Sequence, residues 1–335
     1  MDRIICEDIE NLKGDFKREE FDGKLILVTG GAGFIGSWLC DFFRSFNVEI
    51  TCLDNMSTGR LKNIDHLSGK PGFNFVSKDV CNFKSKIKFD YVLHLASRAS
   101  PEEYQKHPIE TLRANSLGSY KMLELARKND STILFTSTSE VYGDAQVVPT
   151  PETYWGNVNP VGVRSCYDEG KRFAEALFMA YHKEYGLNVR IARIFNTYGP
   201  RIRADGAYGR AVPRFISQAL TDKPITVYGD GTQTRPFCYA TDTATGLLKL
   251  LTSENAKGEI VNIGNPKEMT ILELAQTIKQ LTGSSSPLSF HPLPADDPKR
   301  RCPDINKAER VLRWSPNISL KHGLQKTITW FRGQV

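Results

Sequence analysis

The sequence predicts a doubly wound α/β fold, in which helices cover both faces of a parallel sheet, with a smaller C-terminal cap. Between residues 24 and 196, short apolar runs alternate with longer helical patterns. The apolar runs are rich in β-branched and aliphatic side chains, as in strands that are buried on both faces. A glycine-rich turn joins the first run to the first helical pattern, and the 335 residues suffice for one large or two modest packed units.

Each expected strand of this first part is a short apolar run next to polar or turn-forming residues. These strands span residues 25–29, 49–53, 74–76, 91–95, 132–136 and 189–194. The expected helices between them span residues 34–46, 108–129 and 163–185. Strands that alternate with helices in this order predict parallel pairing within one sheet.

The character of the chain changes after Asn196, where Gly and Pro become frequent and we expect short helices. One further strand, residues 259–263, is expected to rejoin the sheet, and residues 266–335 to form a small helical cap over its carboxyl edge. Ligands of such sheets bind at that edge. We therefore expect a large domain of residues 24–198 and about 237–264, a substrate-binding cap of about 199–236 and 265–335, and an N-terminal extension of residues 1–23.

Composition argues against several classes of protein. With 40% hydrophobic and 24% charged residues, the chain has the composition of an ordinary globular protein. It has no apolar stretch of about 20 residues and no secretory or transit pattern, so we expect a cytoplasmic protein without a membrane partner. Its net charge of +6 is mild and dispersed, which makes a nucleic-acid partner a poor expectation. Seven scattered cysteines without C-x-x-C predict neither a metal site nor a disulfide framework.

A glycine-rich turn follows the first expected strand and opens the first expected helix. Gly30, Gly33 and Gly36 give the spacing G-x-x-G-x-x-G. Because glycine has no Cβ, such a turn can be tight and can let a pyrophosphate approach the helix N-terminus, where free N–H groups favour anions. Strand, turn and helix together predict a dinucleotide-binding domain of the Rossmann type.

Asp54 follows the second expected strand, roughly 20 residues past the glycines. A carboxylate at this place accepts hydrogen bonds from the adenosine ribose hydroxyls and repels a 2′-phosphate. We therefore predict NAD rather than NADP as the cofactor. Two points stay open: Arg60 lies nearby in the sequence, and a solvated turn residue is the alternative for Asp54.

Tyr167 and Lys171 form the pattern Y-x-x-x-K in an expected helix. Residues four apart share one helical face, so an ammonium group can sit close to a phenol. We expect this positive charge to lower the pKa of the phenol, which could then act as a base near neutral pH. Such a pair is usually a surface pair, but next to a dinucleotide-binding half it is the expected base of a short-chain dehydrogenase.

Four segments together resemble an extended short-chain dehydrogenase/reductase of the nucleotide-sugar branch. They are residues 29–36, residues 94–97, the pair Tyr167 and Lys171, and residues 195–201. The resemblance covers about residues 24–332. Within this branch, Thr138-Ser139-Glu140 resembles the UDP-glucuronate decarboxylase (UDP-xylose synthase) family. Dehydratases of the 4,6 type carry Asp where this chain has Ser139, and simple 4-epimerases carry a small residue where Glu140 stands.

Further segments resemble the same family, namely residues 96–101, 154–160, 165–172 and 296–304. One departure is Arg98, which stands where the decarboxylases carry Pro. It lies beside the expected nicotinamide and sugar site, so the substrate contacts there stay open. Arg301 corresponds to an arginine on the carboxylate side of the substrate, although its neighbours Lys299 and Arg300 leave that assignment open.

The resemblance implies NAD-dependent decarboxylation of UDP-glucuronate to UDP-xylose. Tyr167, with Lys171, takes the proton of the sugar C4 hydroxyl while Thr138 polarises that oxygen. The resulting C4 ketone allows carbon dioxide to leave from C5, and internal return of the hydride to C4 gives UDP-xylose. Glu140, or a water that it orients, manages protonation at C5 together with Arg301.

The resemblance also implies binding residues and a homodimer. The expected cofactor-binding residues, besides Tyr167 and Lys171, are Gly30, Gly33, Phe34, Ile35, Gly36, Asp54, Asn55, Ser57, Thr58, Gly59, Asp79, Val80, Leu95, Ala96 and Ser97. The expected residues for the substrate, UDP-glucuronate, are Ser100, Tyr104, Asn196, Arg201, Val212, Tyr228, Arg235 and Arg301. Two chains are expected to associate through the helices near residues 108–129 and 163–185.

Three other functions remain open at this point. A UDP-glucuronate 4-epimerase and a decarboxylase that releases the 4-keto pentose differ from this proposal in timing and ketone rotation, which the sequence does not separate. A non-catalytic NAD-sensing protein is the alternative of another class, because a fold does not fix a function. Intact Tyr167, Lys171 and Glu140 count against it, since such a protein needs none of them.

Overall fold

A seven-stranded parallel sheet forms the centre of the molecule in the computed structural model, which describes residues 2–204, 210–293 and 300–334. Its strands are β1 (Leu25–Thr29), β2 (Glu49–Asp54), β3 (Phe73–Ser77), β4 (Tyr91–His94), β5 (Thr132–Thr138), β6 (Val189–Ile194) and β11 (Ile260–Ile263). They are ordered β11-β6-β5-β4-β1-β2-β3. The order reverses between β1 and β4, where doubly wound sheets bind their ligands, so the predicted fold class is confirmed.

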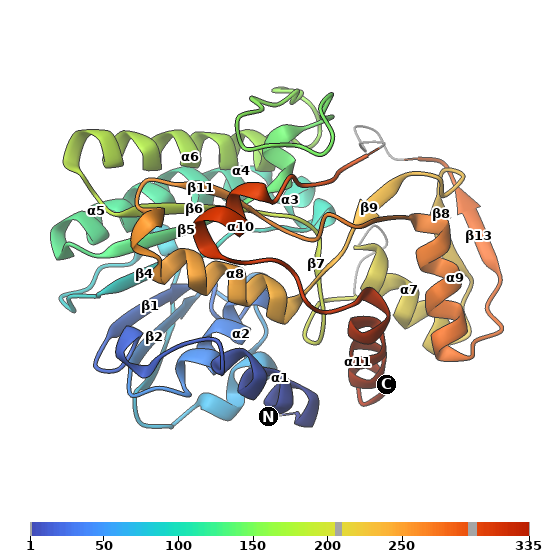
Figure 1. Ribbon diagram of the computed structural model, residues 1–335, viewed down its shortest axis with the longest axis horizontal. Coiled ribbons are helices and arrows are strands. Elements are labelled where there is room, and N and C mark those ends of the chain that lie inside the picture. Colours follow the sequence, from blue (N-terminus) through green and yellow to red (C-terminus); the bar gives the residue numbers. More distant parts are fainter. Residues whose placement is uncertain (1, 205–209, 294–299, 335) are drawn as a thin grey trace.

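Helices cover both faces of this sheet (Figure 1). The helices α2 (Phe34–Phe43) and α8 (Ala240–Thr252) pack on one face. On the other face lie α5 (Ser119–Asn129) and α6 (Ser165–Tyr185), preceded by α4 (Pro108–Arg113) and the π-helical turn η5 (Ala114–Gly118). The expected helix over 108–129 is therefore one continuous helical stretch with an irregular middle, whereas the expected helix over 34–46 ends earlier, at Phe43.

Three of the helices after Asn196 are not short, contrary to the expectation. The helices α8, α9 (Ile271–Thr282) and α11 (Leu320–Arg332) have 13, 12 and 13 residues, against 10 in α2. The glycines and prolines are placed where helices tolerate them. Pro213 is the third residue of α7 (Ala211–Leu220), where no intrahelical N–H bond is required. Gly246 lies inside α8, where a Cβ would come within 2.9 Å of the Ile263 side chain, so the close packing of helix on strand needs a glycine.

The N-terminal residues form a helix, α1 (Arg3–Lys13), that packs on α2 and α8. Ile5, Ile9 and Leu12 are buried at helical spacing. Asp8 accepts a hydrogen bond from the Tyr239 hydroxyl at 2.7 Å and forms an ion pair with Lys326. The spacing of the three apolar residues was the sequence signal for this helix, and it was missed.

The cap lies beyond the carboxyl edge of the sheet, to the right in Figure 1. It contains α7, α9, α11 and three pairs of short strands. These strands are β8 (Ile225–Tyr228) with β13 (Leu288–His291), β9 (Thr234–Pro236) with β12 (Glu268–Thr270), and β7 (Thr197–Tyr198) with β10 (Cys238–Tyr239). Helix α10 (Asn306–Leu312), within the stretch expected to form the cap, packs on β11 and α8.

Short helical segments complete the chain. They are η1 (Arg18–Glu20), η2 (Leu61–Asn63), η3 (Asp65–Leu67), η4 (Val80–Asn82), α3 (Pro101–Lys106), η6 (Ser139–Tyr142) and η7 (Glu254–Ala256). Among the described residues, no helix is long and apolar enough to cross a membrane, and no cluster of His, Cys, Asp and Glu side chains could hold a metal ion. All seven cysteines are free thiols.

Candidate active site

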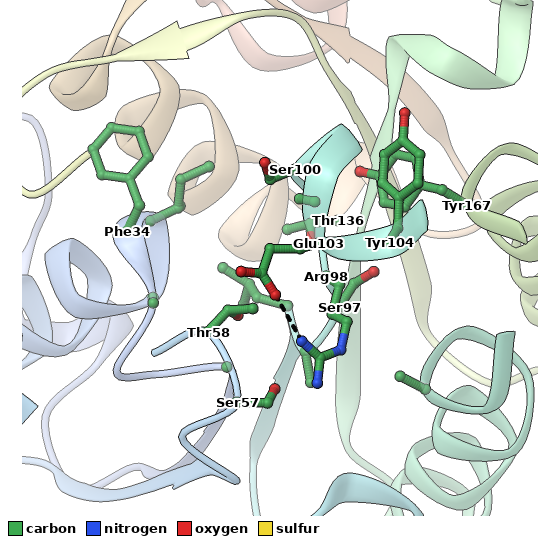
Figure 2. A pocket seen from close by; sticks show the side chains of 18 of the residues that line it. Phe34, Ser57, Thr58, Ser97, Arg98, Ser100, Glu103, Tyr104, Thr136 and Tyr167 are labelled. Atoms are coloured by element: carbon green, nitrogen blue, oxygen red, sulfur yellow. Dashed lines mark hydrogen bonds and ion pairs between the residues drawn. The ribbon is translucent and has the colours of Figure 1, made fainter. Parts of the chain in front are cut away.

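A cavity of about 470 Å³ opens at the carboxyl edge of the sheet. Its walls come from the segments that follow β1, β2, β4, β5 and β6, from α3, and from the first two turns of α6. The loops of a parallel sheet converge at this edge, which is why residues far apart in the sequence meet here. Figure 2 shows the cavity with Phe34 and Thr58 at one side and Tyr104 and Tyr167 at the other.

The glycine turn forms one wall of the cavity. Gly30 has a φ of +69°, and a Cβ there would lie 3.0 Å from the Ala96 amide nitrogen. A Cβ on Gly36 would overlap the Gly30 carbonyl oxygen. Gly33 is the N-cap of α2 and lines the cavity together with the first residues of that helix. The turn therefore presents a helix N-terminus to the cavity, where a phosphate group is stabilised by free N–H groups and by the helix dipole.

Asp54 lies at the end of β2 and is buried beside the glycine turn. Its carboxylate oxygens accept hydrogen bonds from the amide nitrogens of Ala32 at 3.0 Å and Met56 at 2.8 Å. Burial raises the pKa of Asp54, and these two amides oppose that rise. Each oxygen keeps a second lone pair for a ribose hydroxyl, so Asp54 can both hold the turn and bind a nucleotide.

The cavity gathers the expected cofactor-binding residues with one exception. Those that line it are Gly30, Gly33, Phe34, Ile35, Gly36, Asp54, Asn55, Ser57, Thr58, Asp79, Val80, Leu95, Ala96, Ser97, Tyr167 and Lys171. Gly59 does not line it but lies behind Asp54, where a Cβ would come within 2.8 Å of the carboxylate. Among the described residues, four that line the cavity carry a buried polar atom without a hydrogen-bond partner, namely Ser97 Oγ, Tyr104 Oη, Asn196 Nδ2 and Arg201 Nη1. Buried polar atoms of this kind are available to a polar ligand, so these residues fit NAD.

Tyr167 and Lys171 lie on α6 and are both buried at the cavity. Burial lowers the pKa of Lys171 to about 7, and Glu175 opposes this shift. Its Nζ donates to the Thr136 carbonyl at 2.8 Å and lies 5.9 Å from the centroid of the Tyr167 ring. Burial raises the pKa of Tyr167 to about 12, although a hydrogen bond with Thr138 lowers it. The expectation that Lys171 depresses the pKa of this phenol is therefore wrong, because desolvation dominates and the ammonium is directed at Thr136.

Tyr104 supports Tyr167 from α3. Their rings stack with centroids 5.0 Å apart and an angle of 4° between the planes (Figure 2). The Tyr104 hydroxyl is buried and has no hydrogen-bond partner among the described residues, although the side chain lines the cavity. The stack fixes the plane of the Tyr167 ring and leaves a second hydroxyl available in the same cavity.

Glu140 lies in η6, directly after β5, and two arginines hold its carboxylate. Arg301 donates to both oxygens, at 2.6 and 2.9 Å, and Arg164 donates to one of them. Burial would raise the pKa of Glu140, but Arg301 and Arg164 outweigh it and bring the pKa down to about 2. Glu140 is thus a carboxylate at neutral pH. In this ionised state Glu140 has no proton to donate to C5 of the expected sugar substrate.

Arg164 was missed in the sequence, although it is the N-cap of α6, three residues before Tyr167, and lines the same cavity. Its spacing of four from Asp168, with which it forms an ion pair at 3.8 Å, was the available signal.

The structure also distinguishes Arg301 from its neighbour Arg300. The Arg301 side chain is 8% exposed and meets Glu140, whereas the Arg300 side chain is 54% exposed and binds Glu268. The neighbouring Lys299 and the acidic pair Asp296-Asp297 lie outside the described residues.

The other expected substrate residues are divided between the cavity and the cap. Ser100, Tyr104, Asn196 and Arg201 line the cavity. The Arg201 guanidinium also forms a buried ion pair with Asp41 of α2 at 2.6 Å, which occupies part of its bonding capacity. Val212, Tyr228 and Arg235 belong to α7, β8 and β9 of the cap and are not among the described residues that line this cavity.

Arg98, the departure from the decarboxylase pattern, takes part in a chain of polar contacts at the cavity. It donates to Glu103 at 2.9 Å, as the dashed line in Figure 2 shows. Glu103 also accepts from Arg203 at 3.4 Å, and Arg203 donates to the Thr58 carbonyl at 3.2 Å. These contacts connect α3 with the segment after β7 and with the loop after β2. The sequence offered no reason to select Glu103 or Arg203.

The glycine turn, Asp54 and the Tyr167–Lys171 pair meet in one cavity at the switch point of a parallel sheet, and this arrangement defines an NAD-binding short-chain dehydrogenase/reductase. The model of the NAD dependent epimerase/dehydratase family matches residues 26–264. The chain is also 49% identical over 300 residues to UDP-glucuronic acid decarboxylase 3 of Arabidopsis thaliana, covering 89% of this chain and 86% of that one. It therefore belongs to the NAD dependent epimerase/dehydratase family and, within it, to the UDP-glucuronic acid decarboxylases.

A second curated relative agrees with this assignment, and a solved structure agrees with the broader family. UDP-glucuronic acid decarboxylase 1 of Xenopus tropicalis is 47% identical over 339 residues, which cover 99% of this chain and 79% of that one. Among solved structures, a UDP-glucuronic acid 4-epimerase from Bacillus cereus, in complex with UDP-glucuronic acid and NAD, superposes with a TM-score of 0.83. That epimerase is 30% identical, and the match covers 93% of this chain and 100% of the epimerase.

Proposed function

We propose that the protein converts UDP-glucuronate to UDP-xylose and carbon dioxide, using NAD as a cofactor that is regenerated in each cycle. The observation that carries this proposal is Glu140, whose carboxylate is held by Arg301 and Arg164 at the cavity that Tyr167 lines. Arg164 lines the cavity beside the expected base, and Arg301 reaches the same carboxylate of Glu140 without lining the cavity, so guanidinium groups suited to a carboxylate lie next to the site. The names of the relatives support the same substrate.

The residues divide the chemistry between the C4 and C5 sides of the sugar. Bound NAD supplies reversible oxidation at C4. Tyr167 accepts the proton of the C4 hydroxyl, and Thr138, its hydrogen-bond partner, orients the same oxygen. Once C4 is a ketone, the bond from C5 to the carboxylate can break, because its electron pair moves toward the C4 oxygen. Carbon dioxide leaves, C5 takes up one proton, and reduction at C4 completes UDP-xylose.

The epimerase alternative rests on the Bacillus cereus neighbour, which binds the same sugar nucleotide. The identity of 47–49% to decarboxylases over most of the chain favours decarboxylation. A non-catalytic NAD-sensing role is disfavoured, because Tyr167, Lys171 and Glu140 are assembled in one cavity.

Incubation with UDP-glucuronate and NAD, followed by NMR, tests the proposal. UDP-xylose should appear without net consumption of NAD, and the Tyr167→Phe variant is the control for contaminating activity. UDP-galacturonate as the product would replace decarboxylation with epimerisation. A 4-keto pentose with stoichiometric NADH would show that the sugar leaves before C4 is reduced.

We also propose that the protein is a homodimer. Exposed apolar side chains lie on the helical stretch α4–η5–α5 and on α6, the two segments expected to form the interface. They include Ile109, Leu112, Leu117, Tyr120 and Phe173, of which Ile109 is 69% and Phe173 is 52% exposed. An apolar surface on neighbouring helices favours association with a second chain.

A further inference from the structure

Four charged side chains form a cluster next to the catalytic tyrosine. They are Glu140, whose side chain is 16% exposed, and the buried Arg164, Asp168 and Arg301. Arg164 joins the two acids, because it binds Glu140 and also lies 3.8 Å from Asp168. Glu140 and Arg164 line the cavity, whereas Asp168 lies behind Arg164 and does not line it. The cluster therefore has one carboxylate facing the ligand and a second carboxylate one side chain further back.

The charges of this cluster balance when the four groups are ionised, since two carboxylates face two guanidinium groups. A substrate carboxylate adds a third negative charge. Like charges in a buried site disfavour ionisation, so one of the three carboxylates gains affinity for a proton. Glu140 is the poorest candidate before binding, because both arginines hold its pKa near 2 despite burial.

Asp168 is the best candidate by its contacts. Its Oδ2 makes a long contact to Arg164, and among residues 2–204, 210–293 and 300–334 its buried Oδ1 has no hydrogen-bond partner. Burial raises the pKa of Asp168 to about 7, and the charge of Glu140 adds to this rise against Arg164 and Arg301. The titratable or charged groups around it are Glu140 from η6, Tyr104 from α3, Arg301 from the C-terminal segment, Arg164 at the N-cap of α6, and Cys166, Tyr167 and Glu169 from α6 itself.

We propose that Asp168 takes up one proton when the carboxylate of the sugar enters the site, and releases it when that carboxylate leaves as carbon dioxide. This inference rests on the proposed function. The proton count of the reaction agrees with it, since decarboxylation replaces a C5–carboxylate bond with a C5–H bond and so consumes one proton. When the C5–carboxylate bond breaks, its electron pair stays on the sugar and neutral carbon dioxide leaves. C5 takes a proton from solvent and Asp168 returns its own proton to solvent, so that one proton is consumed in total. Asp168 acts through Arg164 and Glu140 and is a positioning residue.

Calorimetry of substrate binding measures this proton directly. NAD-loaded protein carrying Tyr167→Phe, which blocks turnover, is titrated with UDP-glucuronate near pH 8 in buffers with different ionisation enthalpies. Asp168 is ionised in the free protein at this pH, so binding should take up about one proton per site. UDP-xylose, which lacks the carboxylate, should bind without proton uptake. Equal proton uptake with both nucleotides would overturn the proposal, and so would the absence of proton uptake with UDP-glucuronate. Neither result requires a substitution at Asp168.

Asp168→Asn in the same background assigns the proton to its residue. The uptake should fall to near zero while UDP-xylose still binds, which shows that the site is folded. Glu184→Gln, an exposed carboxylate at the far end of α6, is the matched control and should keep the uptake. Uptake that persists in Asp168→Asn but disappears in Glu140→Gln would give the role to Glu140 and overturn the proposal. If UDP-glucuronate does not bind at all, the proposed function fails and this inference with it. If UDP-glucuronate binds to the Tyr167→Phe protein without proton uptake and the wild-type protein decarboxylates it, only this inference fails.

Discussion

At the scale of single residues, burial decides the chemistry of the site more than the spacing of the groups does. Tyr167 and Lys171 share a helical face, yet burial shifts the pKa of both groups toward their neutral forms. Glu140 shows the opposite balance, because two guanidinium groups outweigh its burial. Positive charge near C4 of the sugar therefore has to come from the bound cofactor together with Lys171. Because the pKa of Lys171 is about 7, its charge is sensitive to the bound ligand.

Tyr167→Phe should lower kcat by roughly two to four orders of magnitude, the usual range for a general acid–base group. The affinity for NAD should stay near that of the wild type, because the ring and its stack on Tyr104 are retained. Product formation by NMR and NAD binding by fluorescence check the two parts. Near-normal turnover would mean that another group is the base.

Glu140→Gln should destabilise the fold in a pH-dependent way. The folded-state pKa of about 2 lies below the usual 4.5, so the carboxylate contributes stability above pH 4.5 that is lost as the pH falls toward 2. From this shift we expect a loss on the order of 3 kcal/mol at pH 7 and a smaller loss at pH 4. Urea unfolding at both pH values measures it. A loss that does not change with pH would show that the ion pairs with Arg301 and Arg164 do not stabilise the fold.

At the scale of elements, the unit of β1, glycine turn and α2 forms the cofactor side of the cavity, and α1 supports α2 from behind. The turn depends on close approach of backbone to backbone, as at Gly36. The support depends on the apolar face of α1, which buries Ile5, Ile9 and Leu12.

Gly36→Ala tests the turn. The new Cβ would overlap the Gly30 carbonyl oxygen, so the turn must shift at the place where the pyrophosphate is expected. We expect NAD affinity to fall by at least about tenfold, which corresponds to 1.4 kcal/mol, while circular dichroism stays native. Gly333→Ala is the control, since a Cβ there meets only an ordinary contact at 3.5 Å. Unchanged NAD affinity would place the pyrophosphate elsewhere.

Ile9→Ala tests the support from α1. Ile9 is 3% exposed between α1 and its neighbours, and truncation of a buried Ile costs about 2–5 kcal/mol. Thermal and urea unfolding should show this loss. Glu10→Ala, an exposed change on the same helix, should stay within about 0.5 kcal/mol of the wild type. Equal effects of the two variants would show that α1 does not pack on the domain in solution.

At the scale of the whole molecule, the site lies at the carboxyl edge of the sheet, and the proposed dimer face lies on the helices α4, α5 and α6. Figure 1 places these helices on one face of the sheet and α1, α2 and α8 on the other. Association through the first face would leave the carboxyl edge accessible to ligands.

Ile109→Lys should therefore convert a dimer into a monomer, because it places a charge in the apolar face while costing the isolated chain little at 69% exposure. Light scattering coupled to gel filtration measures the mass. Phe290→Lys, an exposed apolar position in β13 of the cap, is the matched control and should remain dimeric. A monomeric wild type would exclude the proposed dimer, and a dimer that persists in Ile109→Lys would place the interface elsewhere.

Local pattern in the sequence was sufficient for much of the fold and for half of the site. The strands at 25–29 and 189–194 were predicted with their observed bounds, because a buried strand is a local apolar run. The glycine turn, Asp54 and the Tyr167–Lys171 pair were found for the same reason, since each is a short motif at a fixed spacing. Resemblance to a family added Glu140 and Arg301 but not their contact with each other.

What only the tertiary structure decided depends on contacts between distant segments and on burial. Arg301 reaches Glu140 across 161 residues, and no local spacing predicts that ion pair. The roles of Arg164 and Asp168 became visible only beside Glu140, and the raised pKa of Tyr167 only in its buried setting. The physical reason is the same in each case. Periodicity and turn chemistry are properties of neighbouring residues, whereas charge balance and desolvation are properties of the space that the folded chain encloses.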